Sequence, residues 1–264
     1  MPHTAVFFHA HPDDEAIATG GTMARAAAEG HRVVLVVATR GECGEYPDGL
    51  LGPGEAIGDR REAEQREAAR LLGVGRLEFL GYHDSGMAGE PTNDDPAAFW
   101  RADVDEAARR LAAILREEGA DVITVYDDHG GYGHPDHIQV HRVGVRAAEL
   151  AGTPRVYEAT MNRDHLRALL EQAQAPEPTP EGDAPGPEDL DTFGSPASAI
   201  TTTVDVRDFV QVKRAAMAAH ASQITEDSFF LAMPADAFAE AFGQEWFIRA
   251  DRRDARETGL FAGL

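Results

Sequence analysis

The sequence predicts a Rossmann-like α/β fold, with a mostly parallel sheet and helices on both of its faces. Short apolar runs alternate along the chain with longer segments of helical periodicity, which is typical of βαβ units. Several of these runs are continuously apolar and rich in valine, as expected of strands that are buried on both faces. Polar clusters follow the first and the fourth run, at the sheet edge where open parallel sheets bind ligands.

The core of the fold is expected to alternate regularly up to residue 161. The strands are predicted at residues 5–8, 31–39, 76–81, 121–126 and 155–161. The helices between them are predicted at residues 17–29, 55–72, 99–118 and 135–151. Asp13 or Asp14 is placed to cap the first helix, and Gly73 and Gly119 are placed to end the second and third. The crossovers between the parallel strands should be right-handed.

Beyond residue 161 the pattern is less regular. A helix is expected at 162–174, and the segment 175–196 is dense in proline, glycine and acidic residues, which predicts a mobile surface loop. Residues 197–264 are expected to add a small α+β extension to the core, so that 1–264 form a single domain. Its elements are predicted as strands at 199–206 and 245–248, a helix at 207–222 and a helical turn from Pro234.

Composition and charge limit the partners of the chain. The 264 residues carry a formal net charge of −22, which argues against nucleic acid or an anionic membrane surface as a partner. The acidity itself is interpreted as surface charge that favours solubility. The single cysteine, Cys43, excludes an intramolecular disulfide and favours a reducing compartment. No apolar segment of membrane-spanning length and no signal-peptide pattern is visible, so a cytoplasmic location is expected.

The two polar clusters occupy corresponding positions. Residues 10–15 (AHPDDE) follow the first predicted strand, and residues 127–137 (DDHGGYGHPDH) follow the fourth. Crowded carboxylates raise one another's pKa unless a cation neutralises them, so a divalent metal is the simplest reason for such a cluster. A dinucleotide site fits poorly, because HPDDE replaces the G-x-G-x-x-G pattern and would repel a pyrophosphate. A two-metal phosphoesterase would need more bridging carboxylates than these two loops supply.

The residues themselves predict a metal site with three protein ligands. His134 and His137 are three positions apart and share one face of a helical turn. His11, one carboxylate from Asp13 or Asp14, and a histidine from 134 or 137 would leave an open fourth position for water. Such a site is typical of hydrolytic zinc enzymes.

The paired motifs resemble those of the PIG-L/LmbE family of zinc-dependent N-deacetylases. They are His11-Pro12-Asp13-Asp14-Glu15 and His134-Pro135-Asp136-His137, in the same order and in the same strand-end context. Further likeness lies in Thr39–Glu42, Arg61 with Glu64, Asp84–Met87, and Lys213 with His220–Gln223. The resemblance covers nearly the whole chain except 175–196, and it is strongest with the actinobacterial branch of mycothiol-pathway deacetylases and amidases.

The resemblance implies a metal centre and a general base. His11, Asp14 and His137 would hold one Zn²⁺ per chain, although histidine and carboxylate ligands also suit Fe²⁺, Co²⁺ or Mn²⁺. Asp13 would take a proton from the zinc-bound water, whose pKa the metal lowers to about 7.

The same resemblance assigns the remaining site residues. His134 would act as the acid or oxyanion stabiliser, Asp136 would orient His134, and Tyr132 would reach the same oxyanion. Substrate hydroxyls would be held by three further residues, Arg61, Asp84 and Glu45.

The expected activity is removal of an N-acetyl group from a small acetamido sugar resembling an N-acetylglucosamine glycoside. One alternative is an amidase that cleaves a larger acyl amide with the same catalytic residues. The other is a non-catalytic metal-binding sensor, which would not need Asp13 or His134. The sequence leaves the acyl group, the native metal and the oligomeric state open.

Overall fold

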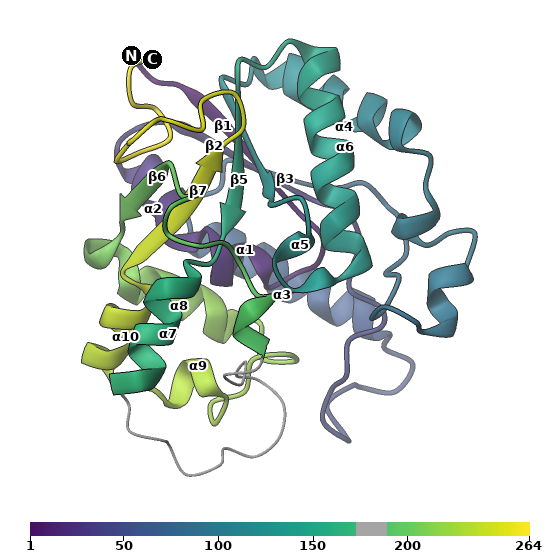
Figure 1. Ribbon diagram of the computed structural model, residues 1–264. Coiled ribbons are helices and arrows are strands. Elements are labelled where there is room, and N and C mark those ends of the chain that lie inside the picture. The colour runs from purple at the N-terminus through teal and green to yellow at the C-terminus, as the bar shows by residue number, and fades with distance from the viewer. Residues whose placement is uncertain (173–188) are drawn as a thin grey trace.

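The computed structural model describes residues 1–172 and 189–264, and it contains one seven-stranded sheet (Figure 1). The order of its strands is β3-β2-β1-β4-β5-β7-β6. The first five strands of that order are parallel, and β7 is antiparallel to both of its neighbours. The predicted α/β class is therefore confirmed. The strands are β1 (Thr4–His9), β2 (Arg32–Val37), β3 (Arg76–Phe79), β4 (Val122–Tyr126), β5 (Arg155–Thr160), β6 (Thr202–Asp205) and β7 (Gln244–Arg249).

Helices cover both faces of the sheet and enclose two hydrophobic cores. Alternate residues of a strand point to opposite faces, so Phe7 belongs to one core and Phe8 to the other. The core around Phe7 is closed by α2 (Gly20–Ala28), α3 (Ile57–Leu71) and α8 (Val210–Ala219). The core around Phe8 is closed by α4 (Val104–Glu118) and α6 (Pro135–Ala151), which lie side by side in Figure 1. Burial on both faces explains the continuous apolar runs of the strands.

The remaining elements are short. They are α1 (Asp14–Ala18), α5 (Gly130–Gly133), α7 (Arg163–Gln172), α9 (Phe229–Ala232), α10 (Ala235–Phe242) and 3-10 turns at 91–94, 99–101, 189–191 and 207–209. The helix predicted from residue 17 is two helices, because the chain breaks at Thr19 between α1 and α2. Asp13 holds the cap position of α1, but its side chain makes no capping hydrogen bond. The predicted N-cap position is therefore confirmed at Asp13, without a capping hydrogen bond from its side chain.

The loop predicted at 175–196 packs against the rest of the protein at its described end, residues 189–196. Residues 175–188 lie outside the described part of the chain. Leu190 is buried, the amide of Ser195 donates to the carbonyl of Met161 at 2.9 Å, and the amide of Gly194 donates to Gly131 at 2.8 Å. The acidic composition of the segment conceals the burial of Leu190.

The strand order creates a switch point between β1 and β4. From β1 the chain adds β2 and β3 on one side, and β4 then pairs on the other side of β1. The crevice at the carboxyl ends of two such strands is where open α/β sheets bind ligands. Residues 10–15 and 127–137 both leave the sheet at this place. No helix within 1–172 or 189–264 is long and apolar enough to cross a membrane.

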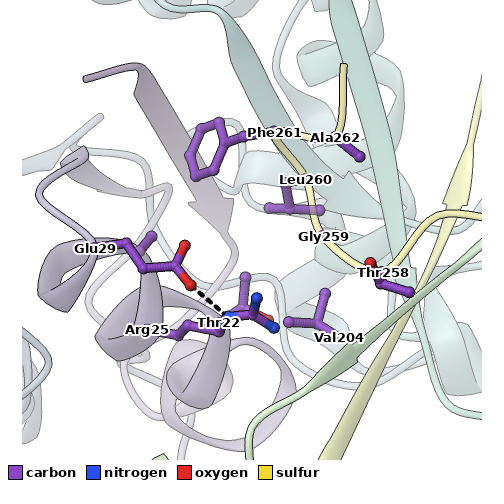
Figure 2. Close-up of a pocket in the computed structure, with 10 residues that line it drawn as sticks. Thr22, Arg25, Glu29, Val204, Thr258, Gly259, Leu260, Phe261 and Ala262 are labelled. Carbon is purple, nitrogen blue, oxygen red and sulfur yellow. Dashed lines mark hydrogen bonds and ion pairs between the residues drawn. The ribbon is translucent and has the colours of Figure 1, made fainter. Parts of the chain in front are cut away.

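A pocket at the opposite edge of the sheet is separate from this crevice (Figure 2). The pocket lies between α2, β6 and the C-terminal segment, and the ion pair of Arg25 with Glu29 spans 2.8 Å within it. Phe261, one of its lining residues, stacks on His31 just before β2 at a ring distance of 3.9 Å. The pocket therefore belongs to the amino edge of the sheet, where both termini lie (Figure 1).

Candidate active site

The loop after β1 is shaped by a sharp backbone turn at Asp13. Its φ is 102°, and it is the single non-glycine residue with a positive φ in the described part of the chain. The turn brings the carboxylate of Asp14 back onto the amide of His11, which donates to Oδ2 at 2.8 Å. The side chains of His11 and Asp14 are thereby fixed next to each other where α1 begins.

The loop after β4 owes its shape to glycine. Gly130 has a φ of 71°, and a Cβ at this position would lie 2.8 Å from the Cβ of His137. His134 then caps α6, because its Nδ1 accepts a hydrogen bond from the amide of Asp136 at 3.1 Å. Pro135 in the first turn suits a helix start, where no amide partner is needed.

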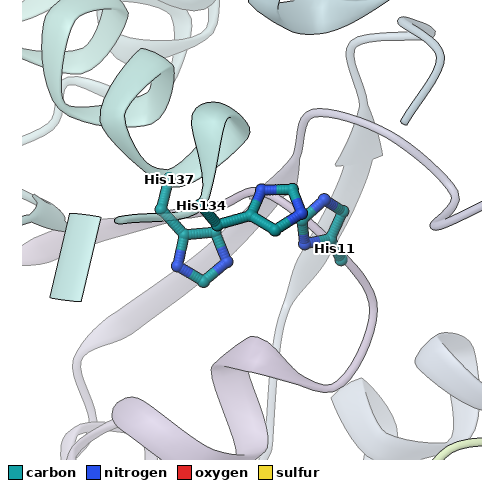
Figure 3. A group of neighbouring side chains, drawn as sticks. All are labelled: His11, His134 and His137. Atoms are coloured by element: carbon teal, nitrogen blue, oxygen red, sulfur yellow. The ribbon is translucent and has the colours of Figure 1, made fainter. Parts of the chain in front are cut away.

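Three histidines, one from the loop after β1 and two from the start of α6, meet in the crevice (Figure 3). His11, His134 and His137 are all buried, and they offer ring nitrogens that lie within 4.8 Å of one another. The ring of His137 is supported from behind by Tyr126, which stacks on it at a centroid distance of 4.2 Å. The structure thus brings together the histidines that the two motifs predicted.

Asp14 lies between two of these histidines. Its carboxylate is 3.4 Å from Nδ1 of His11 and 3.3 Å from Nε2 of His137. Nε2 of His137 is buried and has no hydrogen-bond partner within the described residues. A buried nitrogen without a partner is costly unless something else binds it. These three side chains therefore fit a divalent cation held by two imidazoles and one carboxylate.

The second nitrogen of His11 faces two more carboxylates. Nε2 of His11 lies 3.2 Å from Asp136 and 3.4 Å from Asp84. Asp136 also accepts hydrogen bonds from the amide of Ser85, at 2.9 Å, and from the Ser85 hydroxyl. Carboxylates in this position orient metal-binding histidines and make them more basic.

Asp136 acts on His134 differently from the sequence expectation. Its backbone amide, and not its carboxylate, contacts His134, while the carboxylate lies at His11. Neither contact is visible in the motif, because both depend on the direction in which the first turn of α6 enters the crevice.

The charges of the site favour a cation between them. Burial disfavours the charged form of His11, but Asp84, Asp136 and Asp14 outweigh it and raise the pKa of His11 well above its ordinary value. Burial likewise opposes ionisation of Asp14, but His137 and His11 hold its pKa well below the usual range. The Asp14 carboxylate is therefore ionised and attracts positive charge.

Asp13 and His134 have opposite electrostatic surroundings. Burial raises the pKa of the Asp13 carboxyl to about 6, although the Arg61 guanidinium, 3.1 Å away, opposes the shift. Burial, together with His11 and His137, lowers the pKa of His134 to about 3. At neutral pH Asp13 is consequently a carboxylate whose proton affinity is increased, and His134 is a neutral imidazole.

The predicted substrate contacts are only partly gathered at the site. Arg61 is buried, and it donates to the carbonyls of Pro12 and Gly41, at 2.6 and 2.8 Å, besides its contact with Asp13. The guanidinium therefore connects the loop after β1 with the loop after β2. Glu45 is exposed on the loop after β2.

Asp84 and Tyr132 line the crevice from two sides. Asp84 accepts from the amides of Cys43 and Gly86, at 3.1 and 2.9 Å, and lies beside His11. The ring of Tyr132 contacts His137 edge-on at a centroid distance of 5.0 Å, and the side chain is 48% exposed.

Sequence reasoning missed several residues that support this site. Tyr126 carries no motif signal, and Ser85 was quoted as part of the likeness at Asp84–Met87 without a role. The packing of the loops places Ser85 behind Asp136 and Tyr126 behind His137. Glu15 lies within the first motif and His220 was quoted as part of the likeness, but their contact at 2.8 Å joins positions 205 residues apart. A single sequence contains no direct signal for such a pair.

The fold and the site define a class: Rossmann-like α/β proteins with a buried histidine–carboxylate site for a metal at the switch point of the sheet. The model of the PIG-L family, described as GlcNAc-PI de-N-acetylase, matches residues 6–148. This chain belongs to the PIG-L family, and the resemblance inferred from its motifs is confirmed.

Curated relatives match almost the full length. The 1D-myo-inositol 2-acetamido-2-deoxy-alpha-D-glucopyranoside deacetylase of Thermomonospora curvata is 43% identical, over 98% of this chain and 96% of the relative. The deacetylase of the same name from Streptomyces avermitilis is 42% identical, over 97% and 95%. The solved structure of N,N'-diacetylchitobiose deacetylase from Pyrococcus horikoshii shares the fold, with a TM-score of 0.62, 23% identity, and coverage of 93% and 83%.

Proposed function

We propose that this chain is a zinc-dependent de-N-acetylase that removes acetate from a small acetamido sugar. The inositol glycoside of N-acetylglucosamine is the first candidate substrate, because relatives covering nearly all of the chain are named for that activity. One structural observation carries the proposal. The Asp13 carboxylate, 3.1 Å from Arg61, and the ring of His134, whose centroid is 4.7 Å from that of His11, lie beside residues that fit a metal.

The metal ligands are assigned from the directions of the ring nitrogens. Asp136 faces Nε2 of His11, which leaves Nδ1 of His11 toward Asp14. His137 contributes Nε2, which makes no hydrogen bond within the described residues and lies 3.3 Å from Asp14, and Asp14 contributes its carboxylate. When bound, the metal would supply a Lewis acid that activates water and polarises the amide carbonyl.

Asp13 is assigned as the general base. Its carboxylate is 16% exposed, so solvent competes little for it, and its pKa of about 6 places it close to the operating pH of a neutral enzyme. The contact with Arg61 keeps the group ionised at pH 7 despite its burial. Asp13 can then accept a proton from the attacking water and pass it on.

His134 is assigned as the hydrogen-bond donor to the developing oxyanion, and the proton that Asp13 has accepted goes to the leaving amine. Its Nδ1 accepts an amide hydrogen bond, so the proton of the neutral ring sits on Nε2. An Nε2–H group donates and cannot coordinate a metal at the same time, which separates His134 from the ligand set. The hydroxyl of Tyr132 would provide a second donor from the glycine-flanked loop.

The rival activity is cleavage of a larger acyl amide by the same residues, and substrate comparison tests it. Purified protein would be depleted of metal with a chelator, reloaded with Zn²⁺, Fe²⁺, Co²⁺ or Mn²⁺, and assayed for acetate release from N-acetylglucosamine and its inositol glycoside. We expect no turnover without metal, and faster release from the glycoside once metal is restored. Cleavage only of a bulkier acyl amide would assign the chain as an amidase. Stoichiometric metal without hydrolysis of any amide would favour a binding protein.

A further inference from the structure

The backbone turn at Asp13 is strained and needs support from its surroundings. An L-residue at a φ of 102° and a ψ of −35° lies outside the common allowed regions. Strain of this kind persists only where neighbouring contacts impose it, and it gathers at functional sites. The carbonyl of Asp13 accepts from the amides of Ala16 and Ile17, at 3.0 and 3.1 Å, which any helix start provides. The amide of Asp13 has a more specific partner.

That partner is the side chain of Glu15. The amide of Asp13 donates to Oε2 of Glu15 at 3.1 Å, and Oε1 of Glu15 contacts Nε2 of His220 at 2.8 Å. Both side chains of this pair are fully buried, with 0% exposed. His220 follows the last turn of α8, so the pair joins α8 to the loop that carries the proposed base.

The imidazole of His220 has no other hydrogen-bond partner in the described part of the chain. Its Nδ1 is buried without a partner, so the contact with Glu15 is its single side-chain hydrogen bond there. A buried pair that only filled the core would be replaceable by apolar residues of similar volume. In this pair, however, Glu15 accepts a hydrogen bond from the amide of Asp13, a strained residue at the site.

We propose that Glu15 and His220 are positioning residues, which hold the amide of Asp13 and thereby aim its carboxylate in the left-handed turn. The inference rests on the proposed role of Asp13 as general base. Arg61 fixes the carboxylate at one end, and Glu15 fixes the backbone at the other. His220 keeps Glu15 from rotating away, because Glu15 would otherwise lose its charged partner in the core.

A second buried ion pair on the same helix provides a matched control. Lys213 of α8 contacts Glu245 at 2.6 Å, and both side chains are buried. Glu245 accepts from the amides of Gly21 and Thr22, at 2.8 and 2.7 Å, so this pair anchors α2 and contacts no residue assigned to the site. Both pairs are buried and both involve α8 or the residue that follows it. They differ in the backbone amides that they bind, which are those of α2 for one pair and that of Asp13 for the other.

The test replaces each pair with apolar residues of similar size. The double variant Glu15→Met/His220→Leu leaves no unpaired charge, and we expect it to fold and to bind metal like the wild type. Its kcat should nevertheless fall by about 10-fold or more with little change in KM, because the base is no longer aimed. Hydrogen exchange at the Asp13 amide should accelerate. Glu15→Gln, which keeps an acceptor oxygen, should recover most of both properties.

The control variant Lys213→Met/Glu245→Leu should change the melting temperature but leave kcat and Asp13 exchange unchanged. If the Glu15/His220 variant kept wild-type kcat and a protected Asp13 amide, the pair would be structural and the proposal wrong. A wild-type protein that hydrolysed no amide would refute the proposed function instead. In that case the exchange measurement alone would decide whether Glu15 and His220 hold the turn.

Discussion

Replacing Asp13 by asparagine should make the protein slower and more stable at the same time. Burial raises the pKa of Asp13 from 3.8 to about 6 in the folded protein, so ionising it costs folding free energy. The difference of about 2 pKa units corresponds to about 3 kcal/mol at pH 7, at 1.36 kcal/mol per unit. Asparagine removes this cost and can still accept the hydrogen bond from Arg61.

The sign of the pH dependence follows from the raised pKa. Below about pH 3.8 the carboxyl is protonated in both the folded and the unfolded chain, so it imposes no cost. The cost grows as the pH rises toward the folded pKa of about 6 and is complete above it. Asp13→Asn should therefore gain about 3 kcal/mol at pH 7 and roughly half of that at pH 5, relative to the wild type.

The measurement is urea unfolding of the metal-free wild type and variant at pH 5 and pH 7, followed by activity assays of the metal-loaded proteins. We expect the variant to bind metal and to lose a factor of about 10² to 10⁴ in kcat, which is typical for removal of a general base. A variant no more stable than the wild type at pH 7 would refute the electrostatic reasoning. Wild-type turnover would refute the assignment of the base.

Three further predictions concern the ligands, their support and the fold. His11→Ala, Asp14→Ala and His137→Ala should each lose metal and activity together, as elemental analysis and acetate release will show. Asp136→Asn should keep the fold but weaken metal affinity by about 10- to 100-fold in a competition titration, because its carboxylate orients His11. Leu190→Ala should lower stability by about 2 kcal/mol or more, since Leu190 is 2% exposed; an unchanged melting temperature would contradict its anchoring role.

Much of the fold could be predicted because its signals are local. Apolar runs of strand length and helical periodicity reflect burial on a two-faced sheet, and the core helices begin and end close to the predicted residues. The break at Thr19 was not predicted, because alanine-rich sequence on both sides favours one continuous helix. Leu190 was missed for the opposite reason, since one anchor in an acidic segment leaves no periodic pattern.

The grouping of the site side chains could be predicted from the sequence where they stand in a motif, but not where it depends on tertiary packing. His11, Asp14 and His137 stand in two short motifs at strand ends, and the switch point brings them together. The contacts of Arg61 with two backbone carbonyls depend on how α3 packs against the loops, which no local pattern shows.

The position of the site between β1 and β4 also has a consequence for folding kinetics. The contact of His11 with Asp136 joins residues 125 positions apart. The loops after β1 and β4 therefore meet late in folding, because a long chain segment that includes β2 and β3 separates them. A metal that needs ligands from both loops cannot form part of the folding nucleus. It should instead stabilise the folded sheet, so that added metal slows unfolding more than it speeds refolding.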